Sequence, residues 1–173
     1  MDNKRKGLII YFSRADENYN VGNLTIGNTE QIVKMIKEKI PDIDVFKVER
    51  KKDYPKEYTP CTVEAKDELK MKARPELKET LSDIKKYDII LIGYPIWWGT
   101  FPCPLFTQLE KLDFKNKIVL PFCTHEGSGI SGSMSDIKKC CSGATIKEGL
   151  AIQGSTVKNS KATVFKWIDN NFK

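Results

Sequence analysis

The sequence is poor in the residues that build metal centres and disulfide frameworks. Its 173 residues include one histidine and five cysteines, and no two cysteines form a C-x-x-C pair. This set supplies no zinc site, and an odd cysteine count argues against a network of disulfides. We therefore expect no metal and ordinary free thiols at Cys61, Cys103, Cys123, Cys140 and Cys141.

Long apolar runs and dense basic runs are absent as well. No segment approaches the ~20 apolar residues that cross a bilayer, so we expect a soluble, cytoplasmic protein with no membrane partner. The formal charge is +6, but the 29 basic residues are spread along the chain without a run of five. This spread indicates a solvated surface and no nucleic-acid partner. The length fits one domain spanning residues 1–173.

Short apolar runs alternate with segments of helical periodicity. This alternation predicts an α/β fold, in which right-handed crossovers build a parallel sheet with helices on both faces. The expected strands are Leu8–Phe12, Asp44–Val48, Ile89–Ile92, Lys117–Cys123 and Thr145–Ile152. The expected helices are 28–39, one through Leu77, Leu81 and Ile84, one through Leu105, Leu109 and Leu112, 134–141, and a terminal helix with Phe165, Ile168 and Phe172 on its inner face.

The loop from Ser13 to Thr29 follows the first expected strand and carries hydroxyls, amides and one guanidinium. In a parallel sheet of this type, ligands bind at the carboxyl ends of the strands. Asn28, with Gln31 three residues later, matches a helix N-cap, so the loop ends at a helix N-terminus. Free N–H groups and the helix dipole favour an anion there. The alternative is a capped helix after a long polar loop.

The loop after the third expected strand, Tyr94 to Phe101, contains two of the three tryptophans. Aromatic residues at a strand end often only cover the core. Adjacent tryptophans point in different directions, however, so we expect at least one of them to stack on a flat ligand.

The loop after the fourth expected strand, Thr124 to Gly132, is rich in glycine and contains the only histidine, His125. Glycine lets backbone approach a ligand closely. His125 is a candidate catalytic residue, with a structural or merely exposed histidine as the alternative. The loop also spells G-x-G-x-x-G, but a dinucleotide fingerprint belongs in the first strand-to-helix turn, so we reject that interpretation.

Four motifs at these strand ends resemble the flavodoxin-like family of FMN-binding proteins. They are Tyr-Phe-Ser-Arg at 11–14, Gly-Asn-Thr-Glu at 27–30, Tyr-Pro-Ile-Trp-Trp-Gly at 94–99 and Thr-His-Glu-Gly-Ser-Gly at 124–129. The resemblance implies a flavodoxin-like three-layer sandwich with a five-stranded parallel sheet in the order 2-1-3-4-5. It also implies FMN as the cofactor, with Ser13, Arg14, Asn28 and Thr29 at its phosphate. Pro95, Ile96, Trp97, Trp98, Gly99, Thr124, His125, Glu126, Gly127, Ser128 and Gly129 would flank its ring.

Two features distinguish the chain from the electron carriers of that family. About a dozen residues, 16–27, are inserted before the Gly-Asn-Thr motif, and the net charge is positive. The resemblance implies electron transfer through FMN to a redox partner protein or a small acceptor such as a quinone. There are two alternatives: an NAD(P)H-dependent quinone or flavin-type reductase that uses the same FMN, and a non-redox binding module. We expect the protein to be a monomer or a homodimer. A phosphorylatable receiver is excluded, because Gly93 and Tyr94 stand where it needs an aspartate.

Overall fold

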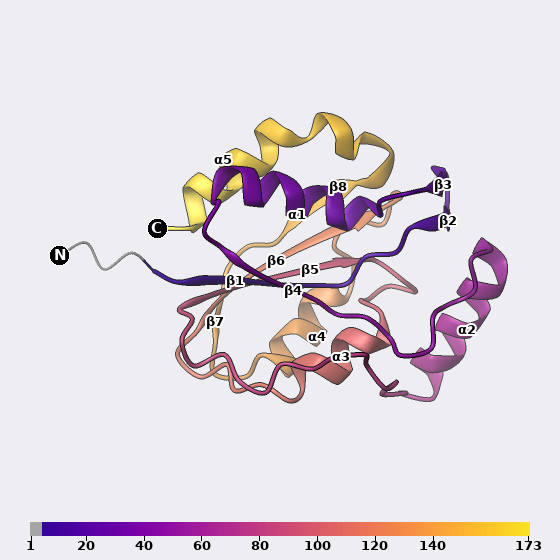
Figure 1. The fold of residues 1–173 in the computed structure, drawn as a ribbon, viewed down its shortest axis with the longest axis horizontal. Helices are drawn as coiled ribbons and strands as arrows, with labels where there is room; N and C mark the ends of the chain where they lie inside the picture. The colour runs from indigo at the N-terminus through magenta and orange to yellow at the C-terminus, as the bar shows by residue number, and fades with distance from the viewer. Residues whose placement is uncertain (1–4) are drawn as a thin grey trace.

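A computed structural model describes residues 5–173, so residues 1–4 of the expected domain lie outside the described part. Two helices cover each face of a parallel sheet in this α/β sandwich, and α2 lies apart at one end (Figure 1). The strands are β1 Gly7–Tyr11, β2 Asp16–Asn18, β3 Gly22–Leu24, β4 Asp44–Lys47, β5 Ile89–Pro95, β6 Ile118–His125, β7 Thr145–Ile146 and β8 Leu150–Gln153. The helices are α1 Asn28–Lys39, α2 Tyr58–Lys70, α3 Cys103–Leu109, α4 Ser133–Cys140, the 3-10 helix η1 Gly154–Asn159 and α5 Lys161–Asn171.

The main sheet has the order β4-β1-β5-β6-β7, and β8 also pairs with β6, all in parallel. The prediction of five strands is therefore wrong by one, because two short strands share the last position of the order. Val119 of β6 lies opposite Ile146 of β7, and Phe122 of β6 lies opposite Leu150 of β8. Three steps along β6 therefore face four steps along the segment that contains β7 and β8. Such a bulge interrupts the ladder next to Pro121, which has no N–H to donate.

Alternate residues of the strands pack into two separate hydrophobic cores. In β1, Leu8 and Ile10 face the side covered by α3 and α4, whereas Ile9 and Tyr11 face α1 and α5. All four are buried, as expected for a strand covered on both faces. The sheet is thus a rigid floor whose carboxyl edge carries the three predicted ligand loops.

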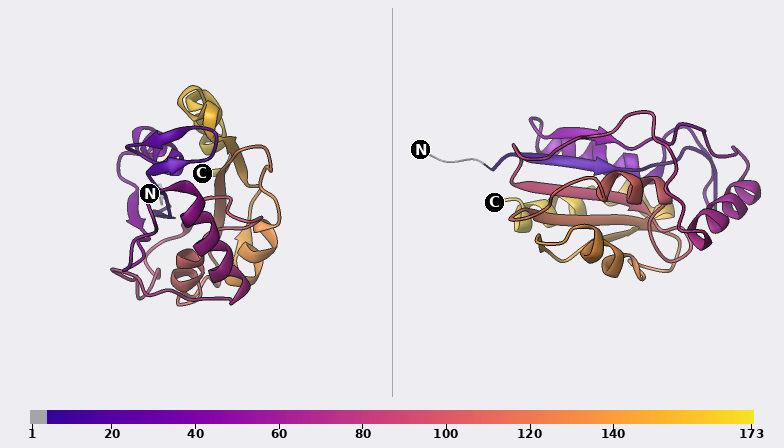
Figure 2. Two further views of the ribbon diagram at one scale, coloured as in Figure 1. Left: turned by 90° about the vertical axis from the view of Figure 1, so that its right-hand side faces the viewer. Right: turned by 90° about the horizontal axis from the view of Figure 1, so that it is seen from below.

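The expected helix through Leu77, Leu81 and Ile84 is wrong. These residues form an irregular segment in which Leu77 bridges to Arg50 and the backbone of Leu81 exchanges hydrogen bonds with the Gln108 side chain. All three side chains nevertheless pack into the same hydrophobic core, so their spacing reflects burial without a helix. The helix between β4 and β5 is instead α2, which lies beyond the carboxyl end of the sheet (Figures 1 and 2).

Two details of the expected helices also need correction. The N-cap of α1 is Gly27, so Asn28 is its first helical residue, and the Gln31 side chain donates to Asn28 Oδ1. On α5 the fully buried residues are Val164 and Ile168, while Phe165 is only half-buried.

The inserted segment 16–27 contains a small antiparallel hairpin, β2–β3. Its turn uses positive φ angles at Asn20 and Gly22, the residue types that adopt them most readily. The hairpin lies at the same end of the molecule as α2 (Figure 1). Within residues 5–173, no helix is long and apolar enough to span a bilayer.

Candidate functional site

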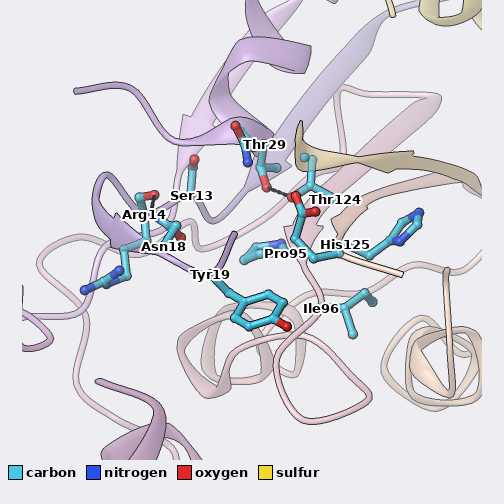
Figure 3. Close-up of a pocket in the computed structure, with 12 residues that line it drawn as sticks. Ser13, Arg14, Asn18, Tyr19, Thr29, Pro95, Ile96, Thr124 and His125 are labelled. Carbon is cyan, nitrogen blue, oxygen red and sulfur yellow. Dashed lines mark hydrogen bonds between the residues drawn. The ribbon is translucent and has the colours of Figure 1, made fainter. Parts of the chain in front are cut away.

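A cavity of about 100 Å³ opens where β1, β5 and β6 end (Figure 3). It is lined by all three predicted loops, by the hairpin and by the start of η1. The lining residues are Ser13, Arg14, Asn18, Tyr19, Asn28, Thr29, Pro95, Ile96, Thr124, His125, Glu126 and Gly154. Nine of these residues belong to the set that the family resemblance implied.

The N-terminus of α1 presents unpaired donors to this cavity. Among residues 5–173, no acceptor meets the backbone N–H groups of Asn28 and Thr29, and those of Ser13 and Arg14 are also without one. The next N–H of the helix, at Glu30, donates to Ser13 Oγ over 3.1 Å. Free N–H groups at the positive end of a helix dipole make an anion site.

Two glycines allow the walls of the cavity to approach each other. A Cβ at Gly27 would lie 2.2 Å from Ser13 Oγ and 2.5 Å from the Arg14 carbonyl oxygen. A Cβ at Gly154 would lie 2.3 Å from Asn28 Nδ2 and 2.5 Å from a Glu126 carboxylate oxygen. The close contacts at Gly27 therefore require glycine, although its φ of −62° suits any residue.

Two hydroxyl groups close the floor of the cavity. Thr29 Oγ1 and Thr124 Oγ1 are 2.8 Å apart and buried, which ties the first turn of α1 to the end of β6 (Figure 3). Each hydroxyl has one proton to donate and lone pairs to accept with. The pair can therefore redirect one of its protons to an anion that enters the cavity.

Arg14 lines the cavity, but its guanidinium points away from Thr29 (Figure 3). The guanidinium donates to the backbone carbonyls of Glu17, Pro55 and Lys56, the latter two over 2.7 Å each. These bonds fasten the hairpin and the segment before α2 to the first loop. The expected phosphate contact of Arg14 remains a prediction, and it would require the side chain to leave these carbonyls.

Glu126 places a carboxylate on the wall beside Asn28, because a Cβ at Gly154 would lie close to both side chains. One oxygen accepts from the Ser155 N–H over 2.7 Å, and the other accepts from Asn20 Nδ2 and Gln153 Nε2 over 3.3 and 3.4 Å. The third loop is thereby linked to the hairpin tip and to η1. Glu126 holds the cavity together, while its charge repels an anion at that wall.

The loop after β5 makes a tight turn in which Trp97 and Thr100 exchange backbone hydrogen bonds of 2.7 and 3.3 Å. Its central residues, Trp98 and Gly99, have φ angles of 54° and 84°. A tryptophan at positive φ is held there against its own preference, a condition that concentrates at functional sites. The Ile96 N–H donates to the Thr124 carbonyl over 2.8 Å, which joins this loop to the third.

The two tryptophans point in different directions, as expected. Trp97 packs edge-on against Phe12 and Tyr54, with ring centroids 5.3 and 5.1 Å away. Trp98 is 51% exposed, and its indole N–H donates to the Thr62 carbonyl of α2 over 2.9 Å. Trp97 therefore supports the loop, whereas Trp98 offers a flat face to the crevice.

A second cavity of about 220 Å³ lies between the tryptophan loop, α2 and the hairpin. It shares Arg14, Asn18 and Ile96 with the first cavity, so the two are neighbours. Its other lining residues are Tyr58, Cys61, Thr62, Ala65, Trp97 and Trp98. None of the nine side chains is acidic.

The third loop contributes less than expected to the cavities. His125 lies at the rim with its ring turned outward (Figure 3), and its Nδ1 accepts from the Gly127 N–H over 3.0 Å. Gly127 and Gly129 have positive φ and would meet no atom with a Cβ, while Ser128 is exposed. The roles predicted for 127–129 and for His125 as a catalytic residue remain predictions.

Sequence reasoning missed the hairpin and α2 as walls of the crevice. Asn18 and Tyr19 come from the insertion, whose Asn and Gly residues are a turn signal between short polar strands. Tyr58, Cys61 and Ala65 come from α2, whose buried face consists only of Cys61 and Ala65. Such a weak apolar stripe gives little helical periodicity.

The thiols and acidic residues suggest no further chemistry. All five cysteines are free, and burial raises the pKa of Cys103 to about 11 and of Cys123 to about 12. Within residues 5–173, no group of histidine, cysteine and acidic side chains could hold a metal ion.

The profile of the flavodoxin family matches residues 6–171, so the chain belongs to the flavodoxin family. No curated protein sequence is significantly similar to the chain.

Several solved structures share the whole fold. A candidate flavoprotein of Bacteroides uniformis is 28% identical with a TM-score of 0.71, covering 95% of this chain and 98% of its own. A candidate flavoprotein of Bacteroides eggerthii is 25% identical with a TM-score of 0.70, covering 96% and 98%. A flavoprotein of Lactobacillus acidophilus in complex with FMN is 24% identical with a TM-score of 0.66, covering 90% and 97%.

Proposed function

We propose that this protein binds FMN in the crevice and transfers electrons through it. The observation that carries the proposal is the set of unpaired N–H groups at Ser13, Arg14, Asn28 and Thr29, four residues that line one cavity at a helix N-terminus. A phosphate ester fits this donor set. The L. acidophilus flavoprotein, crystallised with FMN, and the family membership support the same cofactor.

The size of the first cavity indicates how FMN would lie. Its volume of about 100 Å³ is below the roughly 300 Å³ at which sites for small-molecule ligands begin. The cavity would therefore hold the phosphate and the start of the ribityl chain, and the loop from Pro95 to Gly99 would hold the ring. Bound FMN supplies the redox chemistry, whereas the protein supplies binding, orientation and electrostatics.

Different residues serve the two ends of such a ligand. The α1 N-terminus and the hydroxyls of Ser13 and Thr29 bind the phosphate. The backbone of the tryptophan loop orients the ring.

The decisive experiment compares FMN with riboflavin, which lacks the phosphate. Purified protein titrated with FMN should give a perturbed flavin absorption spectrum and quench the flavin fluorescence. Ser13→Ala combined with Thr29→Ala should weaken FMN far more than riboflavin, because each lost bond to a charged group is worth about 1.5–3 kcal/mol. Equal losses for both ligands, or no binding at all, would refute the proposal.

A reductase acting on small molecules is the second candidate. The second cavity favours it, because this apolar space adjoins the loop over which the ring is proposed to lie. Two assays distinguish the enzyme from the carrier. An enzyme oxidises NADH or NADPH with a quinone as the acceptor, whereas a carrier is reduced by a flavodoxin reductase. A protein that binds FMN but supports neither reaction would be a non-redox binding module.

A further inference from the structure

A third cavity, of about 480 Å³, lies between the C-terminal end of α2 and the helices α3 and α4. None of its lining residues lines either cavity of the crevice. Its volume falls within the roughly 300–1,000 Å³ of small-molecule sites, whereas both crevice cavities are smaller. The third cavity is therefore large enough for a small ligand of its own.

Apolar groups form one part of its wall. Leu69 of α2 and Phe106 of α3 line it, and the Phe106 ring packs against Phe101 with the ring centroids 4.1 Å apart. Cys140 of α4 adds a thiol, and burial raises the pKa of Cys140 to about 11, so the thiol is uncharged at neutral pH. The cavity thus offers an apolar surface to the body of a ligand.

Five charged side chains form the rest of the wall, and four of them pair with each other. Arg74 donates to Glu110 from Nη2 and Nε over 2.6 and 2.7 Å, which is a two-bonded ion pair. Lys139 Nζ lies 3.5 Å from a carboxylate oxygen of Asp136, one turn earlier on α4. The charges of these two pairs cancel.

Lys72, the fifth charged residue, is left without a counterion. Among residues 5–173, no hydrogen bond or ion pair reaches its ammonium group. Its φ is 50°, and the N–H groups of Lys72 and Ala73 close the end of α2 by donating to the carbonyls of Leu69 and Glu68. Glycine is preferred at this position after a helix, because L side chains rarely adopt positive φ. The lysine is therefore unfavourable for the backbone, and its charge serves no contact within the described chain.

From these observations we propose that the third cavity binds a small aryl carboxylate, with the carboxylate at Lys72 and the ring against Phe106 and Leu69. Three basic and two acidic side chains give the wall one net positive charge, which attracts an anion and repels a cation. A flat ring suits the wall where the Arg74 guanidinium lies 4.8 Å from the centroid of the Phe106 ring, because both groups stack on aromatic faces.

The test is calorimetric titration of the protein, with and without saturating FMN, using three probes that share one ring system. They are 2-naphthoate, 2-naphthylmethanol and 2-naphthylmethylammonium. Lys72→Gln removes the ammonium, and Lys70→Gln, on the exposed surface of α2 outside the cavity, is the matched control. Lys72→Gly removes the same charge and supplies the residue that the positive φ prefers. Cys140→Leu narrows the cavity.

We expect 2-naphthoate to bind about 10-fold more tightly than the ammonium probe, with the alcohol between them. Lys72→Gln and Lys72→Gly should each weaken 2-naphthoate about 5-fold and leave the alcohol unchanged, because a partly exposed ion pair contributes this much. Cys140→Leu should weaken both probes, and Lys70→Gln neither. The urea midpoint of Lys72→Gly should not fall, so unfolding does not explain its weaker binding.

Three outcomes would overturn the proposal. The first is the absence of binding by any probe, and the second is an equal loss of 2-naphthoate binding in Lys70→Gln and Lys72→Gln. The third is displacement of 2-naphthoate by FMN, because the probe would then occupy the crevice. The expected selectivity in a protein that binds no FMN would support the third cavity and refute only the proposed function.

Discussion

The two ends of the crevice are built in different ways. The anion end consists of backbone N–H groups, small hydroxyls and a glycine, all within the first turn of α1 and the end of β1. The ring end consists of large aromatic side chains held by α2 and the tryptophan turn. The unpaired N–H groups of the anion end thus come from one strand–helix unit, whereas the ring end depends on segments far apart in the sequence.

Gly27→Ala should break the anion end with the largest effect. Its Cβ would lie 2.5 Å from the Arg14 carbonyl, which is backbone and cannot rotate aside. We expect FMN affinity to fall by about 100-fold, roughly 2.7 kcal/mol, and riboflavin affinity to fall much less. Fluorescence titration with both ligands measures this difference.

Gly127→Ala is the matched control at the other end. Its φ of 116° is unfavourable for alanine, but its Cβ would meet no atom. It should change both affinities by the same small factor. If Gly127→Ala weakens FMN relative to riboflavin more than Gly27→Ala does, then the phosphate binds at the third loop.

The two tryptophans test how the ring end is supported. Trp97 packs against Phe12 and Tyr54, and Tyr54 in turn lies under the Arg50 guanidinium and donates to Glu68. Trp97→Ala should therefore lower the free energy of unfolding by about 3 kcal/mol. Trp98→Ala should change it by less than about 1 kcal/mol while relieving most of the fluorescence quenching caused by FMN.

Urea unfolding and flavin titration of both variants provide the measurement. Trp167, on α5 far from the crevice, is the reference for background fluorescence, and Trp167→Phe should leave the quenching by FMN intact. If Trp98→Ala unfolds as readily as Trp97→Ala, then Trp98 supports the loop and is not a free stacking surface.

The hydroxyl pair between the two ends gives a smaller effect. Thr29→Val or Thr124→Val alone leaves one buried hydroxyl unsatisfied and should destabilise the protein by about 1–3 kcal/mol. The double variant should lose less than the sum of the single losses, because both hydroxyls are then removed. Additive losses in urea unfolding would show that each hydroxyl has another partner.

The sequence predicted the anion end better than the ring end for a physical reason. Ser13, Asn28 and Thr29 are placed by one strand, one loop and one helix start, each with a local signal. Tyr19 and Tyr58 reach the crevice only after the hairpin and α2 dock at the end of the sheet. Arg14 docks both of them through three backbone carbonyls, and no local pattern encodes those bonds.

The split last strand follows the same logic. The sequence predicted one strand at 145–152, but the bulge opposite Pro121 depends on the partner strand. The spacing of Leu77, Leu81 and Ile84 was equally ambiguous, because three residues of an irregular segment that pack into one core can imitate one helix face. Local patterns therefore predicted the strands of the sheet well and the segments that close its carboxyl end poorly.

The smallest effect concerns two buried tyrosines near the carboxyl ends of β1 and β5. Tyr11 packs in the core on the α1 and α5 side of the sheet, and Tyr94 packs in the core on the α3 and α4 side, where its hydroxyl pairs with Ser133 Oγ at 3.0 Å. Burial raises the pKa of each phenol above its usual 10.0, and for Tyr11 the charges of Glu30 and Glu49 add to this. As the pH rises through 10, these two phenols therefore ionise in the unfolded chain but stay protonated in the folded protein.

The stabilisation that follows is complete below pH 10 and is lost as the pH rises from there toward the folded-state pKa. Each such tyrosine makes the free energy of unfolding fall by about 1.4 kcal/mol per pH unit in that range. Tyr11→Phe and Tyr94→Phe should each make the decline shallower by that amount, as measured by urea unfolding at pH 9–11. If the pH slope of the free energy of unfolding is unchanged in Tyr94→Phe alone, then water reaches the Tyr94 hydroxyl in the folded protein. The ring end of the crevice would then be less tightly packed than the anion end.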